Sequence, residues 1–299
     1  LSRLTGREAV DLDQMIETTA GCSIPEIFQR EGESGFRARE RAAAEEAGKR
    51  TGVILLTGGG VVKTPENYDA LHQNGRVYHL LRALDGVDGI ERYRISSIEP
   101  NLLTDEIIAF CAASPKFQHH FHIPLQSGSD KILGLMRRRY TTARFAERIA
   151  AVRALMPDAF IGIDVIVGFP GETDADFRTT YDFLAGLEPA FLHIFPFSER
   201  PGTPAVEMPG KVQASVATRR AAQLEALCAK LHAAFCARAV GSEDSVLFES
   251  TRRGGMMFGF TGNYRRVKAP YDKARVNTIC RVRLGAMDES HDLMGEIRD

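Results

Sequence analysis

Short strand-like runs alternate with amphipathic segments over the first 200 or so residues of this 299-residue chain. The runs at 53–58, 92–98, 120–126, 159–168 and 191–197 each have the length of one β-strand, and the segments between them have the pattern of helices. Mostly apolar strands that alternate with helices are typical of a parallel sheet covered on both faces. Five strands are fewer than the eight of a complete barrel, so the pattern predicts an α/β fold with a partial, TIM-like (β/α) barrel.

Polar residues mark where several of the expected helices begin. Thr104 and Thr141 each stand directly before a helical pattern, as capping residues do. Thr173 and Asp176 have the spacing of a capping box at the start of another helix. Residues 33–50 are rich in charged residues and alanine, which predicts a helix with a solvated face.

The pattern changes after a long helix expected at about 211–239. The segments VLFES, MMFGFT, YRRVKAP, TICRVRL and LMGEIR read as short strands, and Thr261-Gly262-Asn263 is a hairpin signal between two of them. This part predicts a small antiparallel β-barrel of the OB-like kind. We therefore divide the chain into an N-terminal segment at 1–50, the partial barrel at 51–240 and the small barrel at 241–299.

Composition narrows the classes of protein that remain. Apolar residues make up 44% and charged residues 26% of the chain, which is ordinary for a globular protein, and the net charge is −1. Contact with RNA would therefore depend on local basic patches. No apolar run approaches the ~20 residues of a membrane span, and the first residues have no signal-peptide core. We expect a cytoplasmic protein without membrane contact, and the initial Leu1 suggests part of a longer enzyme.

The five cysteines are scattered and include no Cys-x-x-Cys pair, which argues against disulfides in a cytoplasmic chain. Cys228 and Cys236 lie on an apolar helical stripe, and we expect both in the core together with Cys111 and Cys280. Only Cys22, in a Gly-Cys-Ser-Ile-Pro loop, is a candidate ligand.

Each expected strand of the partial barrel ends in glycine or small polar residues. In α/β barrels the site lies at this carboxyl-terminal rim, where glycine permits close approach of a ligand to the backbone. Backbone N–H groups at helix starts favour an anionic group. The rim therefore predicts a small polar ligand with a carboxylate-like or phosphate-like part. The strand ends are Thr57-Gly58-Gly59-Gly60, Ser96 to Pro100, Gln126 to Ser129, Gly168 to Glu172, and Ser198 to Thr203.

Single polar residues near the rim allow two interpretations each. Asp164 lies inside an apolar strand, and a buried carboxylate needs a partner or a function, so we favour a function. Glu99 either pairs with an arginine or serves the site. His120 and His122 share one face of a strand, but two histidines make a poor metal site, which favours structural roles. The run 137–139 is either a solvated helix end or a phosphate contact.

Three long motifs resemble one known family. The segments HIPLQSGSDKILGLMRRRYT, DVIVGFPGETDADF and FSERPGTPA are similar to those of radical S-adenosylmethionine (SAM) methylthiotransferases of tRNA. SSIEPNLLTDEII and MPDAFIGIDVIVGFPGE resemble the branch that acts on threonylcarbamoyladenosine beside the anticodon. The C-terminal VLFES, GFTGNYRRVKAP and MGEI resemble a TRAM domain, a small RNA-binding barrel. The resemblance covers roughly residues 50–299.

The resemblance implies SAM bound across the strand ends and a 4Fe–4S cluster on three cysteines, with an open iron for the amino and carboxylate groups of SAM. Reductive cleavage of SAM would start methylthiolation of a tRNA anticodon stem-loop. The electron donor is unknown, and we expect a monomer without DNA contact. By resemblance the SAM pocket contains Thr57, Gly58, Gly59, Ser97, Glu99, Gln126, Ser127, Asp164, Gly168 and Pro170.

The expected RNA contacts combine an aromatic ring with cations, which is the composition that binds single-stranded RNA. An ordinary edge strand is the alternative for those in the small barrel. The expected RNA-binding residues are Arg137, Arg138, Arg139, Tyr264, Arg265, Arg266 and Lys268.

The cluster motif of the family, CxxxCxxC, is not intact. Cys22-Ser23-Ile24-Pro25 matches its end, but the two positions upstream are Met15 and Thr19. Taking Cys22 as the first cysteine places Glu26 and Gln29 at the other two positions. Neither register supplies three thiolates, which are what hold such clusters.

The N-terminal segment 1–50 is therefore interpreted as a degenerate or divergent part of the family, with Cys22 as the remaining candidate metal ligand. The loop 51–65 also lacks the usual Asn and Asp residues of the family. Three hypotheses remain: a fragment or diverged member of a tRNA methylthiotransferase, a non-catalytic relative that binds SAM or tRNA, or an enzyme that modifies a ribosomal protein. The motifs SIEPNLL and SERPGTPA disfavour the third.

Overall fold

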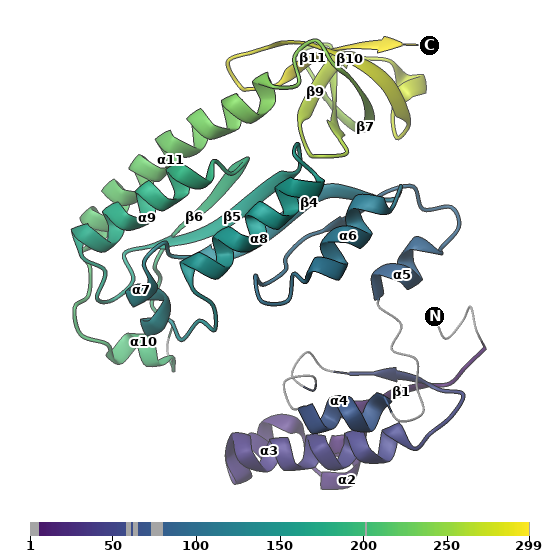
Figure 1. The fold of residues 1–299 in the computed structure, drawn as a ribbon, viewed down its shortest axis with the longest axis vertical. Coiled ribbons are helices and arrows are strands. Elements are labelled where there is room, and N and C mark those ends of the chain that lie inside the picture. Colours follow the sequence, from purple (N-terminus) through teal and green to yellow (C-terminus); the bar gives the residue numbers. More distant parts are fainter. Residues whose placement is uncertain (1–5, 58–60, 62–64, 73–79, 201, 299) are drawn as a thin grey trace. The chain divides into compact units, whose positions relative to one another are not determined.

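The protein is described by a computed structural model that places residues 6–57, 61, 65–72, 80–200 and 202–298 (Figure 1). The chain forms two compact units, Leu1–Gly86 and Val87–Asp299. Among the described helices, none has the length and apolar character that crossing a bilayer requires.

The first unit contains a two-stranded parallel sheet of β1 (Ala9–Asp11) and β2 (Ile54–Leu56). Its helices are α2 (Leu12–Ala20), α3 (Ile24–Gly48), α4 (Pro65–His72) and α5 (Leu80–Asp85). The run at 53–58 contains β2, which pairs with β1 in this sheet. The two compact units divide near residue 86, whereas the sequence predicts a domain boundary at residue 50.

Helix α3 contains the charged segment that the sequence analysis assigned to a helix. Gly32 has a φ of 67° and interrupts the helical backbone ahead of that segment. One side of the helix is buried rather than solvated, because Phe36, Ala44 and Ala47 belong to the core of the unit. Glu40 is buried with them and accepts a hydrogen bond from Arg37 at 2.8 Å.

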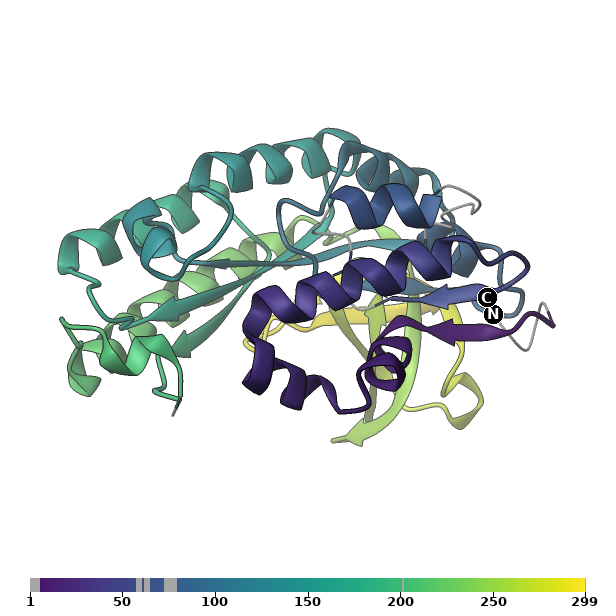
Figure 2. The ribbon, with the colours of Figure 1, turned by 90° about the horizontal axis from the view of Figure 1, so that it is seen from below.

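The second unit contains a four-stranded parallel sheet in the order β3 (Tyr93–Ile95), β4 (Phe117–Gln126), β5 (Phe160–Val167) and β6 (Phe191–Pro196). This confirms the predicted parallel α/β sheet, with four strands instead of five. The segments between strands contain α6 (Asp105–Ala113), α7 (Asp130–Leu135), α8 (Thr142–Leu155) and α9 (Asp174–Leu187), and α10 (Pro204–Glu207) and α11 (Ala214–Ala237) follow β6 (Figures 1 and 2).

The helix starts confirm the capping predictions. Thr104, Thr141 and Thr173 are the N-caps of α6, α8 and α9, and each side chain accepts a backbone N–H of the first turn. Thr173 and Asp176 form the expected capping box. These caps satisfy donors that would otherwise be unpaired at the helix ends.

The two faces of the sheet differ in burial. Phe121, Ile123 and Leu125 of β4 alternate with the residues of its other face and are fully buried, as are Ile163 and Val165 of β5. The opposite face, here called the inner face, carries polar and ring-bearing side chains from β3 to β6. The alternation follows from the two-residue period of a strand, which sends successive side chains to opposite sides.

A closed barrel forms the C-terminal part of the second unit. Its strands are β7 (Glu243–Arg253), β8 (Met256–Thr261), β9 (Arg266–Pro270), β10 (Ile279–Met287) and β11 (Leu293–Arg298), with a short 3₁₀ helix, η2 (Lys273–Arg275), before β10. The strand order is β10-β11-β9-β8-β7. The predicted antiparallel barrel is confirmed except at one place, because β9 and β11 pair in parallel.

Candidate functional site

Residues expected around SAM lie at the carboxyl ends of neighbouring strands of the second unit. Ser97 and Glu99 follow β3, Gln126 ends β4 and Gly168 follows β5. The backbone N–H of Ile98 donates to the carbonyl of His122 at 3.0 Å, so the alignment with β4 continues beyond β3. Because the strands are parallel neighbours, their ends meet at one edge of the sheet.

Glu99 pairs with an arginine, which was one of the two roles that the sequence allowed for it. A guanidinium nitrogen of Arg138 lies 3.6 Å from the Glu99 carboxylate, and both side chains are partly exposed. The hydroxyl of Tyr140 donates to the Pro124 carbonyl at 2.9 Å. Burial raises the pKa of Tyr140 to about 12, and the nearby charges of Glu99 and Asp164 act in the same direction. These groups from three different segments therefore share one environment at the carboxyl edge.

A cavity of about 520 Å³ opens at the same edge. Arg137 and Arg138 line one side of it, and Ile166 of β5 together with Phe169 and Met208 lines the rest with apolar surface. Arg137 and Arg139 are exposed, whereas Arg138 is partly buried by its pairing with Glu99. A cavity with guanidinium groups and an apolar wall is suited to a ligand that has both a carboxylate and a ring.

The corner Gly168-Phe169-Pro170-Gly171-Glu172 after β5 is held by its own side chains. Gly168 has a φ of 80°, and a Cβ atom there would lie 2.8 Å from the Ala217 methyl group, so only glycine is accommodated. The N–H of Gly168 donates to Glu172 Oε2 at 2.7 Å. Because Glu172 accepts this N–H, it is not available to a ligand.

Ser127 is also satisfied inside the protein. It is fully buried, its hydroxyl lies 3.3 Å from that of Thr180, and it accepts the N–H of Ser129 at 3.2 Å. Gly128 donates its N–H to Thr180 at 3.1 Å. These contacts connect the end of β4 to helix α9 and hold the carboxyl edge of the sheet in place.

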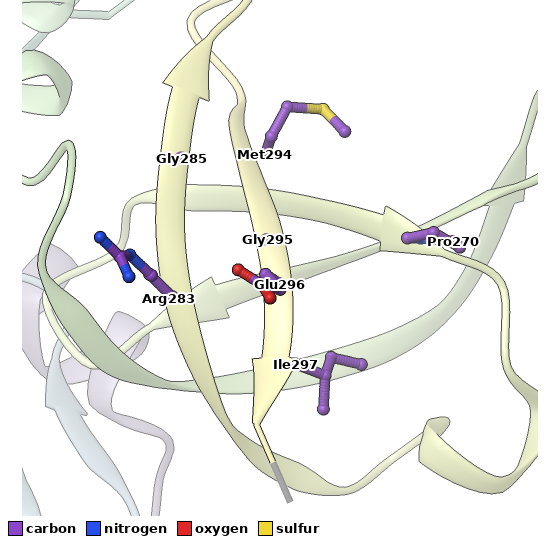
Figure 3. A pocket seen from close by; sticks show the side chains of 7 residues that line it. All are labelled: Pro270, Arg283, Gly285, Met294, Gly295, Glu296 and Ile297. Atoms are coloured by element: carbon purple, nitrogen blue, oxygen red, sulfur yellow. The ribbon is translucent and has the colours of Figure 1, made fainter.

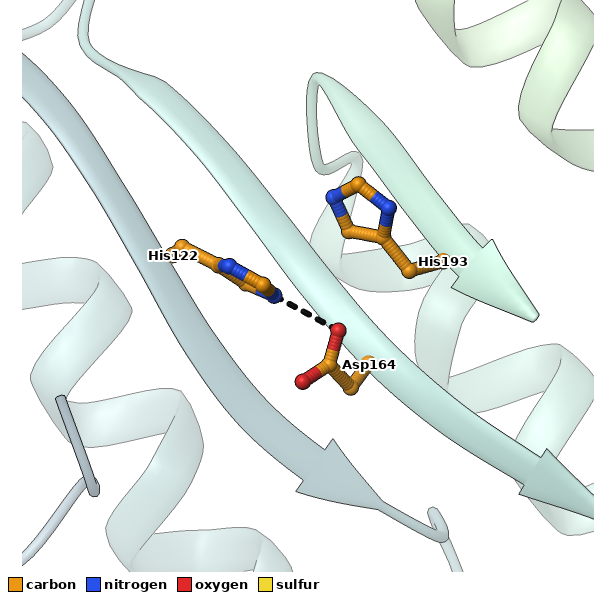
Figure 4. A group of neighbouring side chains, drawn as sticks. All are labelled: His122, Asp164 and His193. Carbon is orange, nitrogen blue, oxygen red and sulfur yellow. Dashed lines mark hydrogen bonds and ion pairs between the residues drawn. The ribbon is translucent and has the colours of Figure 1, made fainter. Parts of the chain in front are cut away.

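Asp164 projects from the inner face and has two histidine neighbours (Figure 4). Its Oδ1 lies 2.6 Å from Nε2 of His122 on β4. The rings of His122 and His193, the latter on β6, have centroids 4.7 Å apart. Burial lowers the pKa of His193, and the adjacent His122 lowers it further. His193 was not among the predicted site residues, although its position between Phe191 and Phe195 in an alternating strand was a usable signal.

The cysteines do not supply a site for a 4Fe–4S cluster. All five lie within the described residues, and Cys111, Cys228, Cys236 and Cys280 are buried as predicted. Burial raises the pKa of the Cys111 and Cys236 thiols to about 11, which disfavours the thiolate form. Cys22 packs beside the apolar cluster of the first unit, and no potential metal-binding group of three or more residues found in the described part of the chain contains a cysteine. The residues present therefore do not fit the cluster.

The predicted RNA-binding segment of the barrel instead joins the barrel to the sheet. Arg265 is 1% exposed, and its two terminal nitrogens contact the Asp158 carboxylate at 2.6 and 2.5 Å. The Tyr264 ring stacks on Phe260 and lies under the Arg94 guanidinium at 4.6 Å. The expectation that Arg265 contacts RNA is therefore wrong, because its guanidinium is enclosed.

The other two cations of that segment have carboxylate partners within the barrel. Arg266 contacts Asp292 at 2.5 and 2.7 Å, and Lys268 pairs with Asp288. Sequence alone showed the cations but not these acidic partners, which both come from the loop between β10 and β11.

His120 lies where the barrel meets the amino ends of the strands. Its ring is 9% exposed, stacks on Phe160 with a centroid distance of 4.8 Å, and meets the edge of Tyr264. Burial lowers the pKa of His120 to about 4, and the charge of Arg94 acts in the same direction. His120 is thus a structural residue, as expected.

This low pKa predicts a loss of stability in acid. Between pH 6.5 and 4 the unfolded chain binds a proton at residue 120 that the folded chain does not, so stability falls as the pH falls through that window. We expect His120 to account for a decrease of about 2 kcal/mol in the free energy of unfolding from about pH 7.5 to about pH 5. Urea titrations followed by circular dichroism should show a smaller pH dependence in His120→Phe than in the wild type. Replacing His119, on the other face of β4, should not change it.

A second cavity, of about 580 Å³, lies on the barrel between β9, β10 and β11 (Figure 3). Met294 and Ile297 give it an apolar surface, and Arg283 and Glu296, which are partners across β10 and β11, provide its charged groups. Gly285 and Gly295 have no side chains to fill it. This surface combines a cation with exposed apolar atoms, but it lacks the aromatic ring that was predicted for the Tyr264 segment.

Comparison with known proteins finds two families. A family model described as shikimate kinase matches residues 1–106. Threonylcarbamoyladenosine tRNA methylthiotransferase MtaB of Bacillus subtilis strain 168 is 38% identical over 213 residues, which are 69% of this chain and 47% of that protein. The tRNA-2-methylthio-N(6)-dimethylallyladenosine synthase of Cereibacter sphaeroides strain ATCC 17029 is 37% identical over 233 residues, which are 77% of this chain and 53% of that protein.

Among solved structures, the radical SAM enzyme coproporphyrinogen III oxidase (HemN) of Escherichia coli is similar with a TM-score of 0.43 and 12% identity, over 85% of this chain and 61% of that chain. The chain spans about half the length of the curated relatives it matches. Matches of this extent must include much of the second unit, because the first ends at Gly86. Through this larger part, the chain belongs to the radical SAM tRNA methylthiotransferase family.

Proposed function

We propose that the second unit binds SAM at the carboxyl edge of β3 to β6 and also binds the tRNA that methylthiotransferases modify. The observation that carries the proposal is the convergence of Glu99, Gln126 and Gly168 on one edge, beside a cavity lined by Arg137 and Arg138. The carboxylate of SAM is matched by a guanidinium group, and its adenine by the apolar wall. Ser97, Ser127, Asp164 and Pro170 complete the proposed surroundings of the ligand.

We further propose that the tRNA substrate carries threonylcarbamoyladenosine beside its anticodon. The support is the 38% identity with an enzyme named for that nucleoside and the SSIEPNLL segment of this chain. Dimethylallyladenosine is the alternative, because a relative named for it is 37% identical. On the barrel, the cavity with Arg283 and Met294 replaces the Tyr264 hairpin as the proposed RNA surface, with Arg137 and Arg139 as further phosphate contacts.

The cluster is left out of this proposal. Hydrogen abstraction by the family requires three thiolates around iron, and the described cysteines do not gather. We therefore favour a chain that binds SAM and tRNA without radical chemistry of its own. The ribosomal-protein alternative has no support among the relatives named above, which act on tRNA.

The first unit is matched by two families. The shikimate kinase model covers it, and a tRNA-2-methylthio-N(6)-dimethylallyladenosine synthase of Cereibacter sphaeroides, 36% identical over 91% of this chain, also extends into it. Thr57 follows β2 in the first unit, and Gly58 and Gly59 lie outside the described residues, so all three stay predicted contacts of SAM.

Binding of labelled SAM by the purified full chain tests the proposal. In equilibrium dialysis we expect saturable binding of one SAM, weakened at least about tenfold by Glu99→Gln and by Gln126→Asn. Asparagine suits position 126 because its backbone φ is 73°, which asparagine tolerates. Asp182→Asn, on the exposed side of α9, is the matched control and should bind as the wild type does.

Iron analysis of the same preparation distinguishes the alternatives. After anaerobic reconstitution with iron and sulfide, we expect no stoichiometric cluster. About four irons per chain would show that the chain is cluster-competent. Absence of SAM binding in the folded wild type would contradict the proposed function itself.

A further inference from the structure

Three side chains that bind metals elsewhere converge on the inner face of the sheet. His122, Asp164 and His193 come from the adjacent strands β4, β5 and β6 (Figure 4). Asp164 is directly opposite His193 in the strand register, whereas His122 is opposite Gly162 and reaches Asp164 diagonally. One atom from each side chain lies within 4.8 Å of the other two. The three groups thus surround a single small volume.

Gly162 leaves that volume open. A Cβ atom at this position would lie 3.6 Å from Nε2 of His193, 3.9 Å from Cδ2 of His122 and 3.1 Å from the Phe160 ring. A larger side chain would enter the space between the two histidine rings. Because residue 162 has no side chain, both histidine rings can lie beside Asp164 on the same face of the sheet.

Among the described residues, hydrogen bonds join only two of the three side chains of this group. His122 and Asp164 pair at 2.6 Å, with side chains 26% and 18% exposed. The ring of His193 is half-buried, and its described neighbours are the rings of His122 and Phe191, neither of which accepts or donates a hydrogen bond to it. A half-buried imidazole without a hydrogen-bond partner has an unshared electron pair available for a cation.

We propose that His122, Asp164 and His193 bind one divalent transition-metal ion of the Zn²⁺ class. Two imidazoles and one carboxylate are a donor set of open, three-ligand sites, in which water or a substrate atom completes the coordination. Donor atoms bound to one tetrahedral ion are about 3.3 Å apart, so the ligands need to move by about 1 Å from their present positions. When the metal binds Nε2 of neutral His122, the proton of that nitrogen moves to Nδ1, and only an imidazolium at this position would release a proton to solvent.

The site does not involve the family's cluster, and it shares only Asp164 with the proposed surroundings of SAM. Its ligands are nitrogen and oxygen donors in the middle of the strands, whereas the cluster needs thiolates. His122 and His193 are outside the proposed SAM site, so metal binding that depends on His193 can fail or succeed independently of SAM binding.

Titration of the chelator-treated full chain with Co²⁺ and Zn²⁺ tests the site. We expect one Co²⁺ per chain with visible d–d absorption, displaced by Zn²⁺, and no thiolate-to-cobalt charge-transfer band. His193→Ala and Asp164→Asn should each weaken binding at least about tenfold. Gly162→Val keeps all three ligands but fills the space between them, and it should weaken binding as well.

Two controls separate this site from other ligands. His119→Ala removes a histidine from the same strand but from its opposite face, and it should bind as the wild type does. Cys22→Ser removes the half-buried thiol of the first unit and should also retain binding. Circular dichroism establishes that each variant is folded. A wild type that binds no stoichiometric ion, or one whose binding survives His193→Ala and Asp164→Asn, would overturn the proposal.

Discussion

Asp158→Ala lowers the free energy of unfolding of the second unit by about 3 kcal/mol or more. The large effect comes from Arg265, which the variant leaves behind. Its guanidinium is 1% exposed, and without Asp158 its described partner is the Phe235 carbonyl, to which it donates at 3.2 and 3.1 Å. A buried charge without a counter-charge is costly because the protein interior solvates it poorly. Asp158 itself is half-exposed, so its removal recovers little of the free energy that burying its carboxylate cost.

Urea denaturation at neutral pH, followed by far-UV circular dichroism, measures this effect. Arg238→Ala is the matched control, because Arg238 approaches the same carboxylate only to 3.9 Å and is exposed, so its loss should change stability by less than about 1 kcal/mol. Adding Arg265→Met to Asp158→Ala should restore part of the lost stability by removing the unpaired charge. If Asp158→Ala and Arg238→Ala changed the free energy of unfolding equally, the Asp158–Arg265 pair would not stabilise the contact between barrel and sheet.

Glu172→Ala is expected to destabilise the second unit by about 3–5 kcal/mol, because it breaks a buried ion pair. Glu172 and Arg220 have side chains that are 1% and 4% exposed, and their charged atoms lie 2.6 Å apart. The variant also leaves the N–H of Gly168 without its acceptor. Arg220 keeps the exposed carboxylate of Asp174 at 2.7 Å and the backbone carbonyl of residue 172 at 3.3 Å. The corner after β5 would lose its buried ion pair with α11.

The same denaturation measurement, combined with SAM dialysis, tests this prediction. Asp174→Asn removes the exposed partner of Arg220 and should cost less than about 1 kcal/mol. Glu172→Gln retains an acceptor for Gly168 but loses the charge, and it should fall between the two. If Glu172→Ala were no less stable than Asp174→Asn, the ion pair would not hold the corner.

Sequence patterns determined the features that depend on near neighbours. Thr104, Thr141 and Thr173 were recognisable as caps because an N-cap bonds to backbone within its own first turn. The burial of Cys228 and Cys236 followed from their helical spacing, and the parallel sheet and the small barrel followed from strand length and alternation. These signals depend on residues that are close in the sequence, and the tertiary packing of the chain is consistent with them.

The tertiary structure alone decided which distant segments meet. The run at 53–58 had the character of a strand, but whether it pairs with β1 or β3 is a choice between partners that its own residues do not encode. Arg265 resembled an RNA contact until folding placed Asp158, 107 residues away, against it. His193 became part of a group with His122 and Asp164 only through strand register. A local pattern sets which face a side chain takes, whereas the neighbours on that face depend on long-range pairing.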